Sequence, residues 1–71
     1  MNSYILKTHR VYVNGKMEAE YRTESCALNY ASWWKMDQGE RDVTVTEGYI
    51  ECPVINGQVY IPTDRQGREL L

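Results

Sequence analysis

The chain has 71 residues, with 8 Lys and Arg against 10 Asp and Glu, which gives a net charge of -2. A charge this close to zero disfavours a nucleic-acid-binding protein, because such proteins are usually clearly basic. The length allows one domain spanning residues 1–71, near the lower limit for folding alone. The composition, 42% hydrophobic and 25% charged, is ordinary for a globular protein and predicts an ordered chain.

Targeting and redox signals point to the cytoplasm. The chain begins at Met1 without a basic and apolar leader, and no segment approaches the roughly 20 apolar residues of a membrane helix. We therefore expect a cytoplasmic protein with no membrane partner. Cys26 and Cys52 are too few for a disulfide framework, and a reducing compartment favours two free thiols over one bridge. The sequence leaves their pairing open.

The N-terminal third predicts a β-hairpin around Asn14-Gly15, the preferred pair for a two-residue type I′ turn. An unbroken register then pairs Val13 with Lys16 and Thr8 with Tyr21. Side chains alternate between the two faces of a strand. The face expected to form the core, interrupted by Thr8 and Arg10, holds Tyr4, Leu6, Tyr12, Met17, Ala19 and Tyr21.

The opposite face of this hairpin is expected to be mostly solvated. It carries charged side chains together with three aliphatic residues, Ile5, Val11 and Val13. Arg10 does not fit the core face unless it lies at the sheet margin or a β-bulge redirects it. Three exposed aliphatic residues on one strand would be a candidate seam for a partner or a second copy.

The segment after the hairpin predicts a helix. Thr23 or Ser25 can cap its start, and Gly39 can end it in a left-handed conformation. At about 100° per residue, one stripe of this helix faces the core, and two of its members are alanines that let a helix lie close to a sheet. The stripe consists of Ala27, Tyr30, Ala31 and Trp34.

The remaining chain predicts two more strands. Val43 to Thr46 alternate as a strand does, Gly48 suggests a bulge or bend, and Asn56-Gly57 predicts a second hairpin. The order is β-β-α-β-β. We therefore predict a single α+β domain, with a small antiparallel sheet built from the two Asn-Gly hairpins and one helix packed on one face. The order of strands across the sheet stays open.

The sequence offers little for catalysis. A catalytic cysteine needs a base within hydrogen-bond reach, and no motif brings Cys26 to His9, the single histidine. A structural zinc site needs four ligands in close pairs, which two isolated cysteines and one histidine cannot supply. The glycines are scattered and form no phosphate-binding loop. We expect no enzyme activity, no metal and no cofactor.

The helix carries more large rings than its core stripe needs. Trp33 lies about 100° around the helix from that stripe, with Met36 beside it and Asn29 and Asp37 flanking. Exposed Trp and Met are typical of protein interfaces. The alternative is that the second hairpin, or Leu70 and Leu71, covers Trp33 and makes it part of the core. The sequence leaves both possibilities open.

The leading hypothesis is a small protein-binding module, an inhibitor or adaptor that occludes a surface of another protein. Its predicted partner-binding residues are Trp33, Met36, Asn29, Asp37, Val11 and Val13. A homodimer fits the same features. The compact, motif-free chain is similar in style to the small accessory proteins with which bacteriophages block host machinery, although no family motif carries that similarity.

The alternative hypothesis is a domain that binds single-stranded nucleic acid or a nucleotide through the first hairpin. Aromatic side chains interleaved with cations can stack bases and contact phosphates. The candidate residues are Lys7, His9, Arg10, Lys16 and Arg22. Alternation places the tyrosines on the other face from most of these cations, and Glu18 and Glu20 weaken the positive field, so the sequence disfavours this partner.

Overall fold

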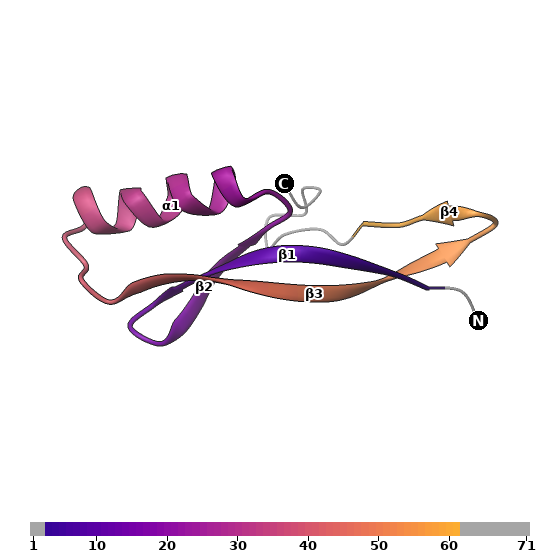
Figure 1. Ribbon diagram of the computed structural model, residues 1–71, viewed down its shortest axis with the longest axis horizontal. Helices are drawn as coiled ribbons and strands as arrows, with labels where there is room; N and C mark the ends of the chain where they lie inside the picture. Colours follow the sequence, from indigo (N-terminus) through magenta and orange to yellow (C-terminus); the bar gives the residue numbers. More distant parts are fainter. Residues whose placement is uncertain (1–2, 62–71) are drawn as a thin grey trace.

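The chain forms an antiparallel sheet with one helix on it, seen in a computed structural model that describes residues 3–61 (Figure 1). Within this part of the chain the sheet has four strands in the order β2-β1-β3-β4. The predicted α+β class and the general β-β-α-β-β order are confirmed. The elements are β1 (Ser3–Val13), β2 (Lys16–Tyr21), α1 (Glu24–Met36), β3 (Val43–Ile55) and β4 (Gln58–Val59).

The pairing of β1 with β2 contains one irregularity, close to the turn at Asn14 and Gly15, that affects the whole molecule. Asn14 and Gly15 have φ angles of 53° and 81°, a region that Gly and Asn tolerate best. Beside this turn Tyr12 pairs with Met17 as the unbroken register requires. One step further the register shifts, and Val11, rather than Arg10, pairs with Ala19. The strand β2 therefore contains a β-bulge.

The bulge reverses the faces that the sequence predicted for the hairpin. Because side chains alternate with a period of two, one extra residue moves the rest of β2 to the other face. Ala19 and Tyr21 consequently share a face with Val11 and Val13, and this face packs under α1. The predicted core face was wrong, and so was the solvated position of Val11 and Val13, which are 0% and 6% exposed.

The core under α1 is made of small side chains. Ala27 and Ala31 of α1 are buried against Val11, Val13 and Val43 of the sheet. Alanines on the inner side of a helix allow its axis to approach the sheet closely, as the sequence predicted. Tyr30 and Trp34, the other members of the predicted stripe, pack around this cluster and are partly buried.

The ends of α1 are set by backbone geometry. Thr23 caps the N-terminus with extended backbone, φ -111° and ψ 143°, although its side chain makes no capping hydrogen bond. At the C-terminus the Asp37 N–H donates to the Trp33 carbonyl at 2.9 Å. The Glu40 N–H donates to the Trp34 carbonyl at 3.0 Å around Gly39, whose φ is 70°. With 13 residues, α1 is not long and apolar enough to cross a membrane.

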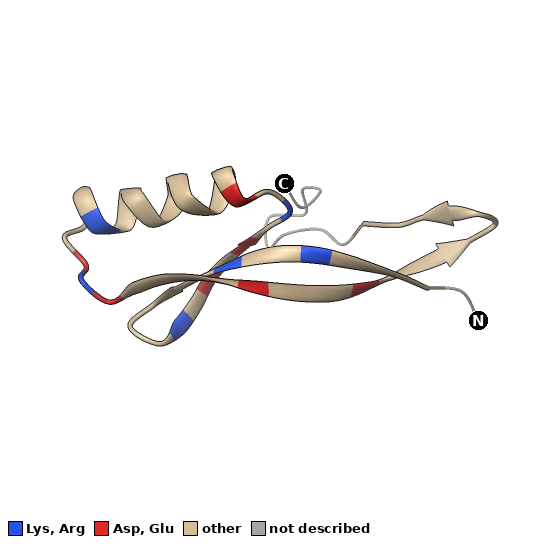
Figure 2. Cartoon of the chain, viewed as in Figure 1, with Lys and Arg blue, Asp and Glu red and all other residues tan. Residues whose placement is uncertain are grey.

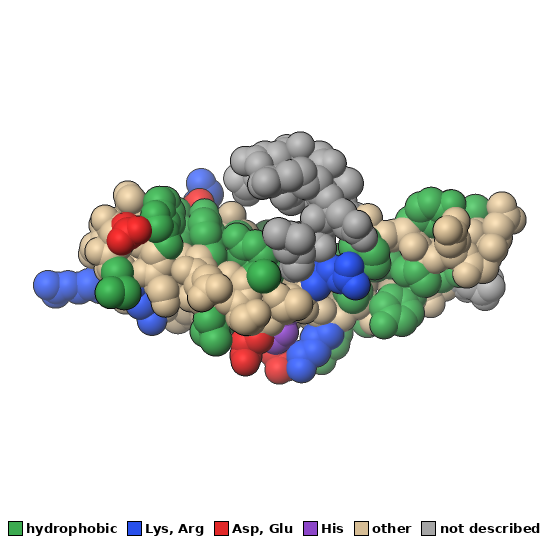
Figure 3. Space-filling model, turned by 90° about the horizontal axis from the view of Figure 1, so that it is seen from above, with side chains coloured by type: hydrophobic (Ala, Val, Ile, Leu, Met, Phe, Trp, Pro, Cys, Tyr) green, Lys and Arg blue, Asp and Glu red, His purple; other side chains and the backbone are tan. Residues whose placement is uncertain are grey.

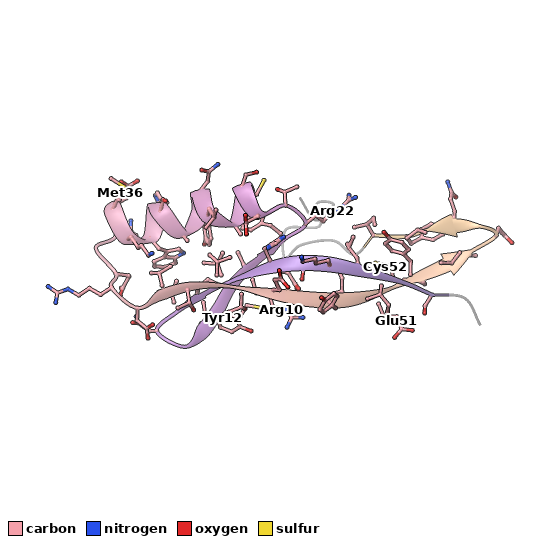
Figure 4. The ribbon with its side chains drawn as sticks, in the orientation of Figure 1. Arg10, Tyr12, Arg22, Met36, Glu51 and Cys52 are labelled. Carbon is pink, nitrogen blue, oxygen red and sulfur yellow. The ribbon has the colours of Figure 1, made fainter. Side chains whose placement is uncertain are left out.

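The long ribbon of β1 and β3 twists so far that its two ends bury opposite faces. Pairing runs without a shift from Ser3 opposite Pro53 to Val13 opposite Val43. Near α1 the buried residues of β1 and β3 are odd-numbered, as Val11 and Val43 are. Beyond α1 the fully buried residues are the even-numbered Thr8 and Cys52. A right-handed twist, larger in two-stranded ribbons, accounts for this exchange. Figure 4 shows it directly, because Tyr12 and Glu51 have opposite parity yet lie on the same side of the ribbon.

Arg10 lies on the face of the ribbon away from α1 and makes a network with Glu20, which resolves its poor fit to the predicted core face (Figure 4). Arg10 Nε donates to Glu20 Oε2 at 2.8 Å, and the buried Thr8 hydroxyl donates to the same oxygen at 2.5 Å. Arg10 Nη2 also donates to the Tyr49 carbonyl at 3.3 Å. The carboxylate of Glu20 raises the pKa of Arg10 further, through its hydrogen bond and its charge.

Gly48 serves this network and does not form the bulge or bend that the sequence predicted. The strand β3 continues through Gly48, which pairs with Thr8 in regular register. A Cβ atom at this position would lie 2.6 Å from Arg10 Cζ and 2.8 Å from Arg10 Cδ. Glycine at position 48 therefore leaves room for the Arg10 side chain, which crosses β3 at that point.

Replacing Val11 by Ala is expected to lower the free energy of unfolding by about 2 kcal/mol, because it removes two buried methyl groups and leaves a cavity. The matched control is Val59→Ala, at a residue that is 40% exposed, with an expected loss below about 0.5 kcal/mol. Urea denaturation of both variants measures this. Equal losses would contradict the assignment of Val11 to the core.

Gly48→Ala is expected to cost about 1–2 kcal/mol, because the new methyl group displaces Arg10 and leaves Glu20 without its cation. In an Arg10→Ala background the same substitution should cost less than half as much, since no side chain then crosses the strand. A double-mutant cycle by chemical denaturation measures the coupling. Additive effects would show that Arg10 is not the reason for glycine.

Candidate partner-binding surface

Trp33 is held by neighbouring rings and still remains partly open to solvent. Its ring stacks on Tyr30, with centroids 5.7 Å apart and planes 14° from parallel. It also meets Trp34 edge-on at 5.2 Å and 73°. The residue nevertheless keeps 41% of its surface exposed. Trp33 is therefore neither sealed in the core nor loosely attached to the surface.

The sequence suggested two segments that could bury Trp33, and the described residues include only the first of them. The second hairpin, made by the end of β3 and β4, lies at the end of the ribbon that α1 does not reach (Figure 1). It therefore does not cover the Trp33 indole. Leu70 and Leu71, the other suggested cover, lie outside the described residues.

The rings beneath Trp33 connect α1 to the sheet. Tyr30 packs edge-on against Tyr21 of β2 at 5.9 Å, and against Trp34 at 6.2 Å. Each such pair contributes about 0.5–1.5 kcal/mol beyond its buried area. The position of the Trp33 indole is thus fixed by contacts on several sides before any partner arrives. A side chain ordered in advance loses less conformational entropy on binding.

Met36 is the most exposed large hydrophobic residue in the described part of the chain, at 82%. It ends α1 and points away from the sheet (Figure 4). Residues three or four positions apart are neighbours on a helix, so Asn29, Met36 and Asp37 all adjoin Trp33. Asn29 and Asp37 are exposed as well. We refer to these four residues, Asn29, Trp33, Met36 and Asp37, as the α1 surface.

The structure brings together only part of the predicted partner-binding set. Asn29, Met36 and Asp37 each adjoin Trp33 by helical spacing, whereas Val11 and Val13 are buried beneath the helix and cannot contact a partner. The reason is the β-bulge in β2, which gives no signal in the residue pattern because Lys16 to Tyr21 read equally well as a regular strand.

Leu28 is not among the partner-binding residues predicted from the sequence, although it lies on α1 and is 49% exposed. At about 100° per residue it lies roughly 140° around the helix from Trp33, so it belongs to a different flank. Its position outside the core stripe was visible in the same helical wheel that identified Trp33. It provides a natural control site on the same helix.

The cations proposed for nucleic acid do not form one free surface. Lys7 pairs with Glu47 at 3.0 Å, and Lys16 lies 3.8 Å from Glu18. The hydrogen bond and charge of Glu47 raise the pKa of Lys7 above its ordinary value. Figure 2 shows Lys, Arg, Asp and Glu mixed along the strands and not separated by sign.

The remaining members of the nucleic-acid set are also separated. Arg10 lies on the other face of the ribbon from Lys7 and His9, where it pairs with Glu20. His9 pairs across the sheet with Tyr21 and Glu47, and not with Glu20 as an unbroken register would require. Arg22 is exposed between β2 and α1. This arrangement gives little support to docking a phosphate backbone on the hairpin.

The groups able to bind metal or act as nucleophiles are also dispersed. Among residues 3–61, no three His, Cys, Asp or Glu side chains gather closely enough to hold a metal ion. Cys26, which is partly buried, and Cys52, which is buried, are both free thiols. The α1 surface is therefore the candidate site.

The two tryptophans should differ in their accessibility to a neutral quencher. A Trp34→Phe variant retains only Trp33, and its fluorescence is expected to be quenched by acrylamide at least about twice as steeply as that of Trp33→Phe, because collisional access depends on exposed surface. Both variants in urea serve as the control and should be quenched alike. Equal quenching in the folded state would show that the two indoles are equally shielded.

Comparison with protein families, with curated proteins and with solved structures finds no match to this chain. The α1 surface itself is therefore the basis on which a function can be proposed.

Proposed function

We propose that the chain is a protein-binding module, an adaptor or inhibitor that works by covering a surface of another protein with its α1 surface. The observation that carries this proposal is Met36, 82% exposed, beside a Trp33 indole that neighbouring rings hold in place. Trp is enriched among the residues that dominate interface energies, and Met among interface residues generally. The activity is binding and not catalysis.

Burying Trp33 and Met36 in an interface would contribute a modest part of the binding free energy. A tryptophan side chain buries up to about 250 Å², so covering the exposed fraction of Trp33 removes roughly 100 Å² from water. At about 25 cal/mol per Å² that contributes roughly 2.5 kcal/mol, and Met36 adds an amount of similar order. Association itself costs several kcal/mol, so the two anchors need further contacts around them.

Polar residues around the anchors are suited to supply these contacts. Asn29 offers both donors and acceptors, Asp37 is an acceptor, and Lys35 is an exposed cation in the last turn of the helix. A hydrophobic centre with a polar rim is the usual anatomy of an interface. A partner with an apolar pocket bordered by hydrogen-bonding groups would fit this arrangement.

The test is capture of partners from the native cell with tagged wild type, Met36→Glu and Leu28→Glu. Met36→Glu should reduce recovery of the specific partner at least tenfold, since it places a charge in the centre of the contact without touching the core. Leu28→Glu, an equivalent change on the other flank of the same helix, should leave recovery unchanged. Capture that survives Met36→Glu, or fails equally with Leu28→Glu, would reject the α1 surface.

Trp33→Ala is a less clean test because Trp33 also packs against Tyr30 and Trp34. We expect it to abolish binding and also to lower the free energy of unfolding by about 1–2 kcal/mol. Circular dichroism and urea denaturation separate the two effects. Complete unfolding would place Trp33 in the core and remove its role as an anchor.

A further inference from the structure

Exposed hydrophobic residues gather at the end of the molecule that α1 does not cover. The chain measures 46 × 20 × 19 Å along its principal axes, and α1 lies over only one end of the ribbon (Figure 1). In Figure 3 the end that carries β4 presents hydrophobic and uncharged side chains. The exposed large hydrophobic residues there are Tyr4, Ile5, Tyr49, Ile55, Val59 and Tyr60.

Four of these residues share one face of the sheet. Ile5 of β1 and Tyr49 and Ile55 of β3 are all odd-numbered positions. Ile5 pairs with Glu51 and Tyr49 with Lys7, while Ile55 pairs with Gln58 of β4. The Tyr60 N–H donates to the Pro53 carbonyl, and its hydroxyl lies 3.4 Å from Gln58 Oε1 on the same side. Together with Pro53, an exposed odd-numbered residue of β3, these four residues form the set that we call the arm face: Ile5, Tyr49, Pro53, Ile55 and Tyr60.

The twist of the ribbon turns the arm face away from α1. Figure 4 shows Glu51, which shares this face, on the side of the ribbon opposite the helix. Ile5, Tyr49, Ile55 and Tyr60 are between 48% and 60% exposed. The helix of the same chain therefore cannot cover them, and neighbouring positions across the strands make them a continuous patch.

The size of the arm face approaches what a stable interface needs. Its two half-exposed tyrosines and two half-exposed isoleucines offer roughly 300 Å² of apolar surface, taking usual side-chain areas. One partner in a standard interface contributes about 800 Å², of which somewhat more than half is apolar. The arm face thus provides about two-thirds of that apolar area before Pro53 and the flanking side chains are included.

The charges on this face favour a second copy over an apolar partner. Glu51 lies among the hydrophobic residues, next to Ile5, and has no ion-pair partner among residues 3–61. Covering a lone carboxylate with apolar surface is costly. Lys7 stands on the same face beside Tyr49, and its side chain, which pairs with Glu47 at 3.0 Å, is still 52% exposed. A two-fold axis would bring each Lys7 toward the Glu51 of the other copy, so that the ammonium group lies between two carboxylates, Glu47 of its own chain and Glu51 of the other.

We propose that two copies of this chain associate face to face through the arm face, about a two-fold axis. The two sheets pack at the usual separation of about 10 Å, with the apolar residues at the centre and the Lys7 and Glu51 side chains paired across the interface. A second subunit is also a common way for a chain near the lower size limit to gain buried area. Both α1 surfaces stay free at opposite ends, so the dimer is bivalent.

Sedimentation equilibrium of the full chain tests this proposal. The wild type should behave as twice 8.3 kDa at tens of micromolar, and its melting temperature should rise with concentration. Ile5→Glu and Tyr49→Glu should each weaken the dimer at least tenfold while keeping the circular dichroism spectrum. Leu28→Glu, the matched change at an exposed hydrophobic residue of α1, should remain dimeric.

Glu51→Lys provides a second variant that keeps the test decisive if an arm substitution prevents folding. It replaces one exposed charged residue by another, and should weaken the dimer at least tenfold because it opposes two lysines. A wild-type chain that stays at 8.3 kDa up to several hundred micromolar overturns the proposal. Dimers that survive all three arm substitutions as well as Leu28→Glu does overturn it too.

Discussion

The pairing of β1 with β2 is the constraint on which the rest of the structure depends. A single extra residue in β2 sets the register so that Ala19 and Tyr21 lie on the same face as Val11 and Val13. With that face apolar, α1 has a surface on which Ala27 and Ala31 can pack closely, and Tyr21 becomes the support for Tyr30. Without the bulge, alternation would place Ala19 and Tyr21 on the face opposite Val11 and Val13, and the cluster under α1 would lose these two members.

Twist is the second constraint, because it gives the two ends of one ribbon different chemistry. At the helix end, the odd-numbered face is buried under α1 and is made of small aliphatic residues. At the β4 end, the same face turns outward and presents larger side chains, including Ile5 and Tyr49. The 13-residue helix covers only one end of this long ribbon (Figure 1), and the uncovered end is where association with another chain buries the most apolar surface.

The residues proposed for binding are also tied to stability. Trp33 and Tyr30 stack on each other, so the ring that would anchor a partner is also part of the packing between helix and sheet. Met36 has no such role, which makes it the better probe of function. On the other side of the ribbon, Arg10, Glu20 and Gly48 form a polar arrangement in which an arginine crosses a strand. Arg10, one of the five residues of the nucleic-acid hypothesis, is thereby paired with Glu20.

The sequence by itself determined the α+β class, through the order of its predicted strands and helix. It also determined which residues of the helix face the sheet and that Trp33 lies outside this stripe, because the 3.6-residue period of a helix is local and regular. The stripe consists of Ala27, Tyr30, Ala31 and Trp34. The sequence did not determine which face of the first hairpin is buried, since a bulge changes the outcome without a signature in residue type. Nor could it show that Gly48 makes room for Arg10, a contact between residues on different strands. Strand order, twist and the exposed arm face were decided only by tertiary structure, because each depends on which distant segments pair and how far the paired strands rotate.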